Sequence, residues 1–172
     1  WTLMEVLVVC SLASILGATS VSGFSRMATQ VRTGTASAQL VADLTFAREM
    51  SRRTGVPHYV DVDTASSGVN YRVKREAAPP TMAPSTDPVV RASLLAGRLR
   101  GVRFALNGAT CDPYGLAISA AAPSRVVFDA RGLPTSAAAF FLASEDGATR
   151  KVVSVTATGR VRTWTSSGSS WQ

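Results

Sequence analysis

The chain begins with a long apolar segment that carries a single charge. From Val6 to Phe24 the sequence runs for 19 residues without a charged side chain. As an α-helix rising about 1.5 Å per residue, this stretch would be about 28 Å long, close to the hydrocarbon thickness of a bilayer. The pattern predicts a membrane helix over residues 1–26. No later apolar run in the sequence approaches this length, so we expect one span followed by one soluble domain.

The next part of the sequence keeps the helical period but becomes amphipathic, which predicts a continuation of the helix over residues 27–55. The apolar positions that recur at helical spacing are Met27, Val31, Leu40, Leu44, Ala47 and Met50. Gly55 followed by Pro57 is a typical helix stop. We expect the apolar stripe to pack on a sheet and Arg48, Arg52 and Arg53 to form a solvated helix face.

From residue 56 the period changes to two, which predicts a β-rich domain over residues 56–164 and an α+β fold. The expected strands are 58–63, 69–74, 99–106, 115–119, 125–129, 139–143, 151–156 and 160–164. Between the second and third strands, the proline-rich tract 76–96 is predicted to be a long irregular loop. The Ser/Gly-rich residues 165–172 are predicted to be a flexible tail.

Enzyme chemistry finds little support in the sequence. His58 is the only histidine and begins an alternating strand, so a surface or strand residue is expected, not a general base. Asp61 and Asp63 share one strand face and are expected to be solvated. No nucleophile elbow, phosphate loop or His/Cys cluster occurs. We therefore predict no enzyme, no cofactor and no metal site.

Glu5 is the one charge inside the apolar segment, and two interpretations remain open. It can lie at the membrane interface and reach water, or it can pair with a cation at the same depth. The segment offers such a cation only at its own α-amino group, on Trp1. If helices pack side by side with an axial stagger, Glu5 of one subunit meets the amino terminus of its neighbour and fixes the register between them.

The first nine residues, Trp-Thr-Leu-Met-Glu-Val-Leu-Val-Val, resemble the mature N-terminus of type IV pilins and type II secretion pseudopilins. The resemblance implies that a prepilin peptidase cuts before Trp1 and that the new terminus is methylated. It also implies that Glu5 acts in filament assembly. The expected location is the bacterial inner membrane with a periplasmic domain, and then the pilus or cell surface.

Three later motifs are similar to the GspH/FimT branch of minor pilins and pseudopilins. They are Ala47-Arg48, the strand and turn Val127-Phe128-Asp129-Ala130-Arg131-Gly132, and Thr158-Gly159-Arg160-Val161-Arg162. This resemblance implies a pilin fold, in which a long N-terminal spine helix packs on two small antiparallel sheets. It also implies a minor component near the filament tip that helps to initiate assembly with other pilins. The absence of a tryptophan in the early strands favours a type IV pilus over the type II secretion pseudopilus, which stays an alternative.

The charge of the chain adds a second functional hypothesis. The sequence has 18 Lys and Arg against 11 Asp and Glu, a net charge of +7. Alternation places Arg160, Arg162 and Trp164 on one strand face, where guanidinium groups could hold phosphate and the indole could stack a base. Some FimT relatives use a Gly-Arg-x-Arg motif at this place to bind DNA in natural transformation. The simpler interpretation, a turn glycine with two exposed strand arginines, stays open beside it.

Overall fold

The computed structural model describes most of the chain. Its described residues are 2–63, 70–77, 87–94, 101–105, 125–145, 147, 149–167 and 170–172, without the side chains of 18–23, 94, 167 and 170. Several sequence predictions lie outside these residues. They are the processed terminus at Trp1, the predicted strand 115–119 and about half of the proline-rich tract 76–96.

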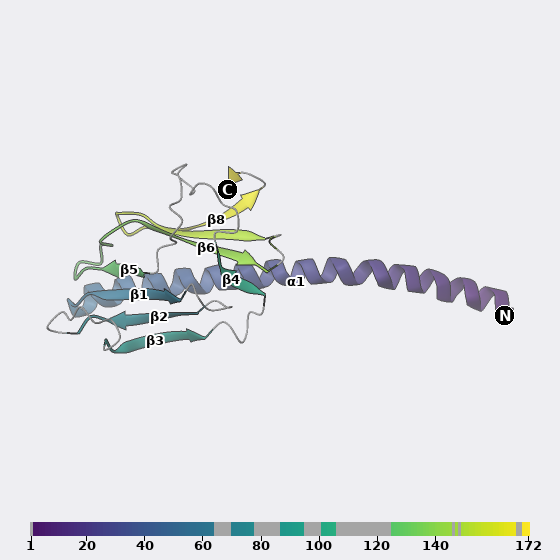
Figure 1. The fold of residues 1–172 in the computed structure, drawn as a ribbon, viewed down its shortest axis with the longest axis horizontal. Coiled ribbons are helices and arrows are strands. Elements are labelled where there is room, and N and C mark those ends of the chain that lie inside the picture. The colour runs from purple at the N-terminus through teal and green to yellow at the C-terminus, as the bar shows by residue number, and fades with distance from the viewer. Residues whose placement is uncertain are drawn as a thin grey trace.

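One helix of 52 residues, α1 (Leu3–Thr54), joins the two predicted helical segments without a break. Thr2 caps its start, where the Thr2 Oγ1 accepts a hydrogen bond from the Glu5 N–H at 3.4 Å. Gly55 ends it in the left-handed conformation (φ 66°), and the Gly55 N–H donates to the Ser51 carbonyl at 3.0 Å. The predicted helix stop is therefore confirmed. The N-terminal half of α1 projects away from the rest of the molecule (Figure 1).

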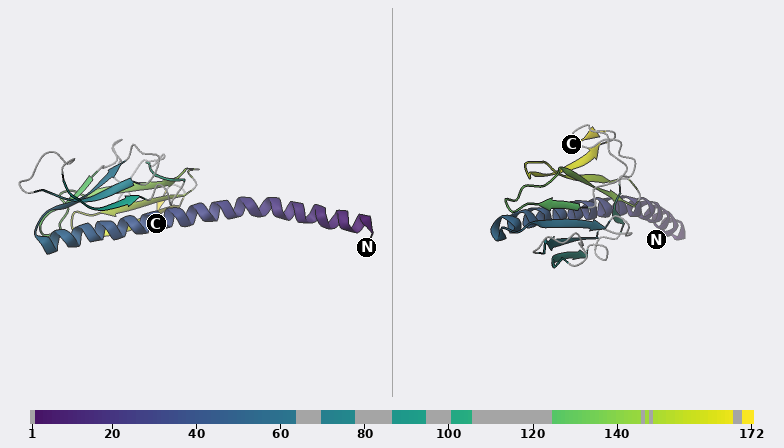
Figure 2. Two further views of the ribbon diagram at one scale, coloured as in Figure 1. Left: turned by 90° about the horizontal axis from the view of Figure 1, so that it is seen from below. Right: turned by 60° about the vertical axis from the view of Figure 1, so that its left-hand side comes forward.

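Two antiparallel sheets cover one side of the C-terminal half of α1 (Figure 2). The first sheet has the order β3-β2-β1-β5, with β3 (Val89–Leu94), β2 (Asn70–Arg75), β1 (His58–Asp63) and β5 (Arg125–Phe128). The second sheet has the order β4-β6-β7-β8-β9, with β4 (Val102–Phe104), β6 (Ala138–Ser144), β7 (Arg150–Val155), β8 (Val161–Ser167) and β9 (Ser170–Trp171). The predicted α+β fold of a spine helix on two small sheets is confirmed.

The core lies where the helix and both sheets meet. Its helical members are the predicted apolar stripe, with Ala36, Leu40, Leu44 and Ala47 completely buried. Alternating residues of each strand complete it, as expected when one face of a sheet is covered. Phe104 of β4 joins the two sheets, because its ring lies edge-on to Tyr71 at 6.4 Å and to Phe140 at 6.5 Å.

Two predictions about the β domain were wrong. The tract 76–96 was predicted to be an irregular loop, but it contains β3, which begins directly after Pro88 and pairs with β2. An edge strand can start after a proline, because its outer backbone groups need no partner in the sheet. The residues 165–172 were predicted to be a tail, but β8 continues to Ser167 and the chain turns back as β9. Thr165 and Gln172 exchange two backbone hydrogen bonds, of 2.6 and 2.9 Å.

The N-terminal half of α1 is an exposed apolar surface. Its large exposed side chains are Leu3, Met4, Val6, Leu7, Val8, Val9, Leu12, Ile15, Leu16, Phe24, Met27 and Val31. Among the residues that the structure describes, no helix is long and apolar enough to cross a membrane. Among the side chains of α1 that the structure describes, Thr33 is the first that is completely buried.

Candidate functional site

Glu5 lies near the free end of α1, between exposed apolar side chains. The neighbouring Met4 is 72% exposed and the other neighbour, Val6, is 49% exposed. The Glu5 N–H donates to the Thr2 carbonyl at 3.0 Å, which places the acid in the first turn of the helix. An acid in the first turn is stabilised by the helix dipole. The predicted pairing with an amino terminus concerns a neighbouring subunit and stays a prediction, and Trp1 lies outside the described residues.

The predicted basic strand is β8 together with the turn before it. Arg160 is exposed in this turn, where its backbone N–H donates to Thr156 Oγ1 at 3.1 Å. Arg162 and Trp164 follow within β8, and the Arg162 guanidinium carbon lies 5.9 Å from the centre of the Trp164 ring. The Trp164 indole N–H donates to Ser154 Oγ at 2.9 Å. The structure therefore brings Arg162 and Trp164 together as expected, with both side chains half-buried.

Gly159, the first residue of the Gly-Arg-x-Arg motif, has a structural role of its own. Its φ is 78°, a conformation that favours glycine, and its carbonyl accepts a hydrogen bond from Arg48 Nη1 at 3.0 Å. A Cβ on Gly159 would lie 3.2 Å from Arg48 Nε and 3.3 Å from the carbonyl oxygen of Gly132. The glycine therefore lets the β7–β8 turn approach the end of α1 closely.

Gly132, in the turn between β5 and β6, packs on the same part of the helix. Its φ is 75°, and a Cβ there would come within 2.7 Å of the side-chain carbons of Arg52. The turn is held by Asp129, whose carboxylate accepts hydrogen bonds from the backbone N–H groups of Leu133 at 2.8 Å and Arg131 at 2.9 Å. These hydrogen bonds hold the pKa of Asp129 below its usual range, and the one from the Leu133 N–H has the largest effect.

The three late motifs that carry the resemblance therefore meet at one place. Ala47-Arg48 belongs to the C-terminal part of α1, and the distant turns with Gly132 and Gly159 both pack against it. Ser51 connects them further, since its hydroxyl lies 3.3 Å from the Phe128 carbonyl oxygen and accepts a hydrogen bond from the His58 N–H at 3.0 Å. These contacts explain why the motifs have glycine at positions 132 and 159, because a side chain there would crowd the helix on which the turns pack.

Asp43 is a buried carboxylate whose importance the sequence analysis missed. It has no exposed surface and accepts a hydrogen bond from the Tyr71 hydroxyl at 2.6 Å and another from Gln39 Nε2 at 3.2 Å. Arg91 Nη1 lies 2.9 Å from its other oxygen. Burial, and then the hydrogen bond to Asp43, raises the pKa of Tyr71 well above its usual value. An acid one turn from Leu40 and Ala47, on the buried stripe, was the signal that could have found this cluster.

A second polar cluster lies on the face of the first sheet that points away from α1. The Tyr59 hydroxyl donates to Asp87 at 2.6 Å, and Asp87 also accepts from the Ala77 N–H at 3.1 Å. Asp61, predicted to be solvated, is instead half-buried between Lys74 at 3.5 Å and Arg125 at 3.3 Å. The correction has a simple reason, because the two cations come from the neighbouring strands β2 and β5.

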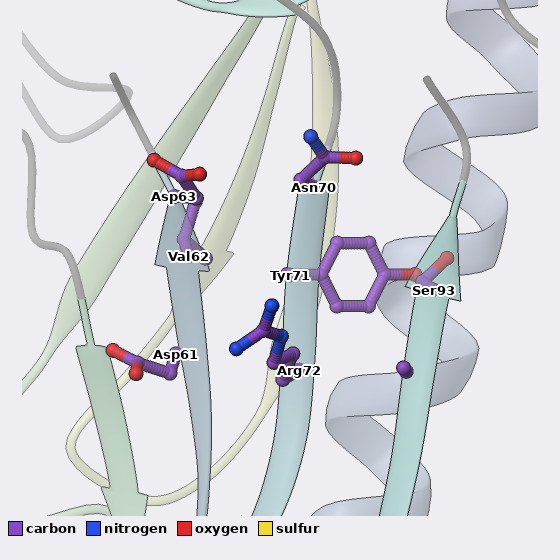
Figure 3. A pocket seen from close by; sticks show the side chains of 8 residues that line it. Asp61, Val62, Asp63, Asn70, Tyr71, Arg72 and Ser93 are labelled. Atoms are coloured by element: carbon purple, nitrogen blue, oxygen red, sulfur yellow. The ribbon is translucent and has the colours of Figure 1, made fainter. Parts of the chain in front are cut away.

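His58 is a strand residue, as predicted, but its side chain is completely buried. Its Nδ1 lies 2.8 Å from the Val56 carbonyl oxygen, so Nδ1 carries the proton in that contact. Beside β1 and β2, a groove of about 380 Å³ is lined by Asp61, Asp63, Asn70 and Arg72 among others (Figure 3). Within the described ranges, no three His, Cys, Asp or Glu side chains are placed to hold a metal ion.

Comparison with known proteins adds two findings to this geometry. The family model of the type II transport protein GspH matches residues 36–159. The crystal structure of the type IV minor pilin FimU from Pseudomonas aeruginosa is similar, with a TM-score of 0.51 and 15% sequence identity. The similarity covers 81% of this chain and 91% of the FimU chain. A search of curated proteins gave no match. The predicted pilin fold and the GspH/FimT resemblance are therefore confirmed, and the chain belongs to the GspH family.

Proposed function

We propose that the chain is a minor subunit of a type IV pilus or a related filament, placed near the tip, where it helps to initiate assembly. The observation that carries this proposal is the projecting half of α1, whose described side chains include many exposed apolar ones outside the folded domain. Burying apolar surface between helices is worth about 25 cal/mol per Å², so a bundle of such helices supplies the cohesion of a filament. The place near the tip rests on the resemblance to the GspH/FimT branch.

In this proposal the protein acts by contacts with other pilins and not as an enzyme. Before assembly the subunit is held in the inner membrane with its domain in the periplasm, and prepilin peptidase has exposed the α-amino group of Trp1. Glu5 of one subunit then pairs with the amino terminus of the next, because a carboxylate among apolar helices needs a cation. The pair selects one axial register among the many that an apolar surface alone would allow. A place in a type II secretion pseudopilus is the alternative with the same fold.

The test is the recovery of Glu5→Ala in filaments sheared from cells. We expect the variant to fold normally and to be missing from the sheared fraction, since the register contact is lost. Glu49→Ala is a matched control, because Glu49 is an exposed acid of the same helix whose contact with Arg52, at 4.0 Å, is a weak surface pair. Recovery of Glu5→Ala at the wild-type level would contradict the pairing.

A second candidate function is capture of DNA during uptake. It is favoured by Arg162 and Trp164, which lie against each other on β8, and by the exposed Arg160 beside them. Such a surface can bind phosphate and support a base, with affinity on the order of micromolar or weaker for nonspecific contacts at physiological salt. We expect Arg160→Gln with Arg162→Gln to weaken binding of duplex DNA in a gel-shift titration and to flatten its salt dependence.

The choice of control for this titration follows from the structure. Arg91 would be a poor control, because its guanidinium is paired with the buried Asp43. Arg72 is a better control, because it is an exposed arginine of β2 on the other sheet. If the Arg160/Arg162 variant binds as tightly as the wild type, or the wild type gives no shift at low salt, the DNA function is wrong.

A further inference from the structure

Five arginines from three separate segments gather at the end of the molecule where α1 stops. We call this surface the arginine pole, and its members are Arg48, Arg52, Arg53, Arg131 and Arg160. Three of them belong to the last two turns of α1. The other two come from the β5–β6 turn and the β7–β8 turn, which lie beside the end of the helix (Figure 1). The pole is therefore opposite the projecting N-terminal half.

The convergence of these segments rests on direct contacts. The Arg48 guanidinium donates to the carbonyl of Gly159 at 3.0 Å, and the next residue along the chain is Arg160. The aliphatic part of Arg52 lies over Gly132, and the residue before that glycine is Arg131. The two glycines are themselves close, since a Cβ on Gly159 would be 3.3 Å from the Gly132 carbonyl oxygen. The tight packing of both turns thus carries their arginines to the helix end.

The pole has more positive charge than its own acids neutralise. Two acidic residues lie beside it: Glu49, at 4.0 Å from Arg52, and Asp129, at 3.1 Å from Arg131. Among the described residues, no acid forms an ion pair with Arg53 or Arg160. Five cations against two anions leave a net charge of +3. The Arg131 side chain is 80% exposed, so it remains accessible from solvent despite its ion pair.

A solvated helix face explains only part of this arrangement. Arginines in the last turn of a helix are favourable because they offset its dipole, and this accounts for Arg52 and Arg53 without any ligand. It does not account for Arg131 and Arg160, which belong to turns outside the helix. Arg48 is half-buried and holds the β7–β8 turn, so it positions the surface and is not itself free to bind a ligand.

We propose that the arginine pole binds the phosphate backbone of duplex DNA and extends the basic strand surface around the β7–β8 turn to the end of α1. This inference rests on the second candidate function, DNA capture, and adds a part of the surface to it. Arg160 connects the two parts, because it lies at the pole and two residues before Arg162 on β8. Arg52, Arg53, Arg131 and Arg160 are the proposed phosphate contacts.

The chemistry of the pole indicates which ligand it fits. Guanidinium groups bind phosphate oxygens through paired hydrogen bonds, and most contacts that position a protein on DNA go to phosphates. The three segments of the pole, residues 48–57, 129–133 and 156–160, contain no aromatic residue. Without a stacking platform the pole cannot hold unpaired bases, so it favours duplex over single strands. Contact with phosphates alone also predicts no sequence preference.

The experiment compares two double variants of the full chain in a neutral detergent, each with the same loss of two positive charges. The pole variant is Arg53→Gln with Arg131→Gln, and the control is Arg72→Gln with Arg75→Gln, two exposed arginines of β2. Binding of a duplex DNA fragment is titrated at several salt concentrations. Affinity falls with salt, and each lost phosphate contact reduces the steepness of log affinity against log salt by about 0.9. We therefore expect the pole variant to reduce the steepness by about 1.8 and the control to leave it unchanged.

The possible results separate this inference from the function on which it rests. Equal slopes for the pole variant and the wild type would overturn the pole while DNA binding stood, provided that Arg160→Gln with Arg162→Gln still weakened it. A wild-type chain that binds no DNA at low salt would overturn both. If the pole variant bound DNA normally but were lost from sheared filaments, the pole would contact an acidic neighbouring subunit instead, and the proposal would be wrong. Circular dichroism of each variant checks that the fold is retained.

Discussion

Arg91 Nη1 lies 2.9 Å from Asp43 Oδ1, which joins the outermost strand of the first sheet to the middle of the buried helix face. The Asp43 carboxylate has no exposed surface, while the Arg91 side chain remains 47% exposed. The pair therefore connects the solvent side of β3 with the interior. Tyr71 of β2 binds the same carboxylate, so one helical acid holds two neighbouring strands in place.

Replacing this acid should destabilise the domain. We expect Asp43→Ala to lower the free energy of unfolding by about 2–4 kcal/mol, because the Tyr71 hydroxyl would stay buried without its acceptor and Arg91 would lose its counter-charge. Asp43→Asn keeps an acceptor oxygen and should cost less. Urea denaturation followed by circular dichroism measures both. A midpoint for Asp43→Ala equal to that of the wild type would show that the cluster contributes nothing to stability.

The motif glycine Gly159 should be less replaceable than other glycines with the same backbone conformation. Gly55 is a matched control, since its φ is also positive at 66° but a Cβ there would meet nothing within 4 Å. We expect Gly55→Ala to cost about 1 kcal/mol for the left-handed backbone alone. Gly159→Ala should cost about 1–2 kcal/mol more, because its Cβ would press on Arg48 and on the Gly132 backbone. Equal melting temperatures for the two variants would contradict the close approach.

Asp87 should make the stability of the domain depend on pH in the acid range. The hydrogen bond from the Tyr59 hydroxyl, followed by the one from the Ala77 N–H, holds the pKa of Asp87 below its usual range. The contribution of Asp87 to the free energy of unfolding is therefore fully present above the pKa of an unfolded aspartate, about 4. It is lost as the pH falls through the lower pKa of the folded state. We expect Tyr59→Phe to flatten the loss of stability between about pH 4 and pH 2. An unchanged pH profile would show that this hydrogen bond does not set the pKa.

A truncated chain that begins near residue 28 should form a folded, β-rich monomer. The physical reason is that, among the described side chains of α1, complete burial begins at Thr33, while those of residues 2–17 and 24–27 are exposed. The truncation also removes Cys10, so Cys111 is the one cysteine left and no internal disulfide can form. We expect the circular dichroism spectrum and the elution volume to be the same with and without reductant. Loss of the folded signal on reduction would contradict this prediction.

Local patterns in the sequence were sufficient to predict most elements of the fold. The helix, its stop at Gly55 and the pairing of β1 with β2 depend on periodicity and on turn residues. Both signals can be read from a short stretch of sequence. The strand β3 was missed because prolines before it hid a short run of strand formers. The strand β9 was missed because its composition is that of a tail, and its pairing depends on Thr165 across the turn.

The site could be predicted only where neighbours in sequence are also neighbours in space. The contact of Arg162 with Trp164 follows from the alternation of one strand, and it was predicted. The contact of Arg48 with Gly159 joins residues 111 positions apart, and no local pattern indicates it. The burial of Asp43 likewise depends on Arg91 and Tyr71 from distant strands. Charges on a helix therefore looked solvated until the sheets that cover them were known.

The order in which the chain visits the two sheets has a consequence for how the subunit is made. After β3 the chain crosses to the second sheet for β4, returns to the first for β5, and crosses again for β6. Neither sheet can be finished before the other is under way, and the second also waits for β7 and β8 near the C-terminus. Such nonlocal pairing slows folding. A nascent subunit held by its N-terminal helix would therefore stay vulnerable to proteolysis until its last strands had emerged, and only full-length chains would survive to join a filament.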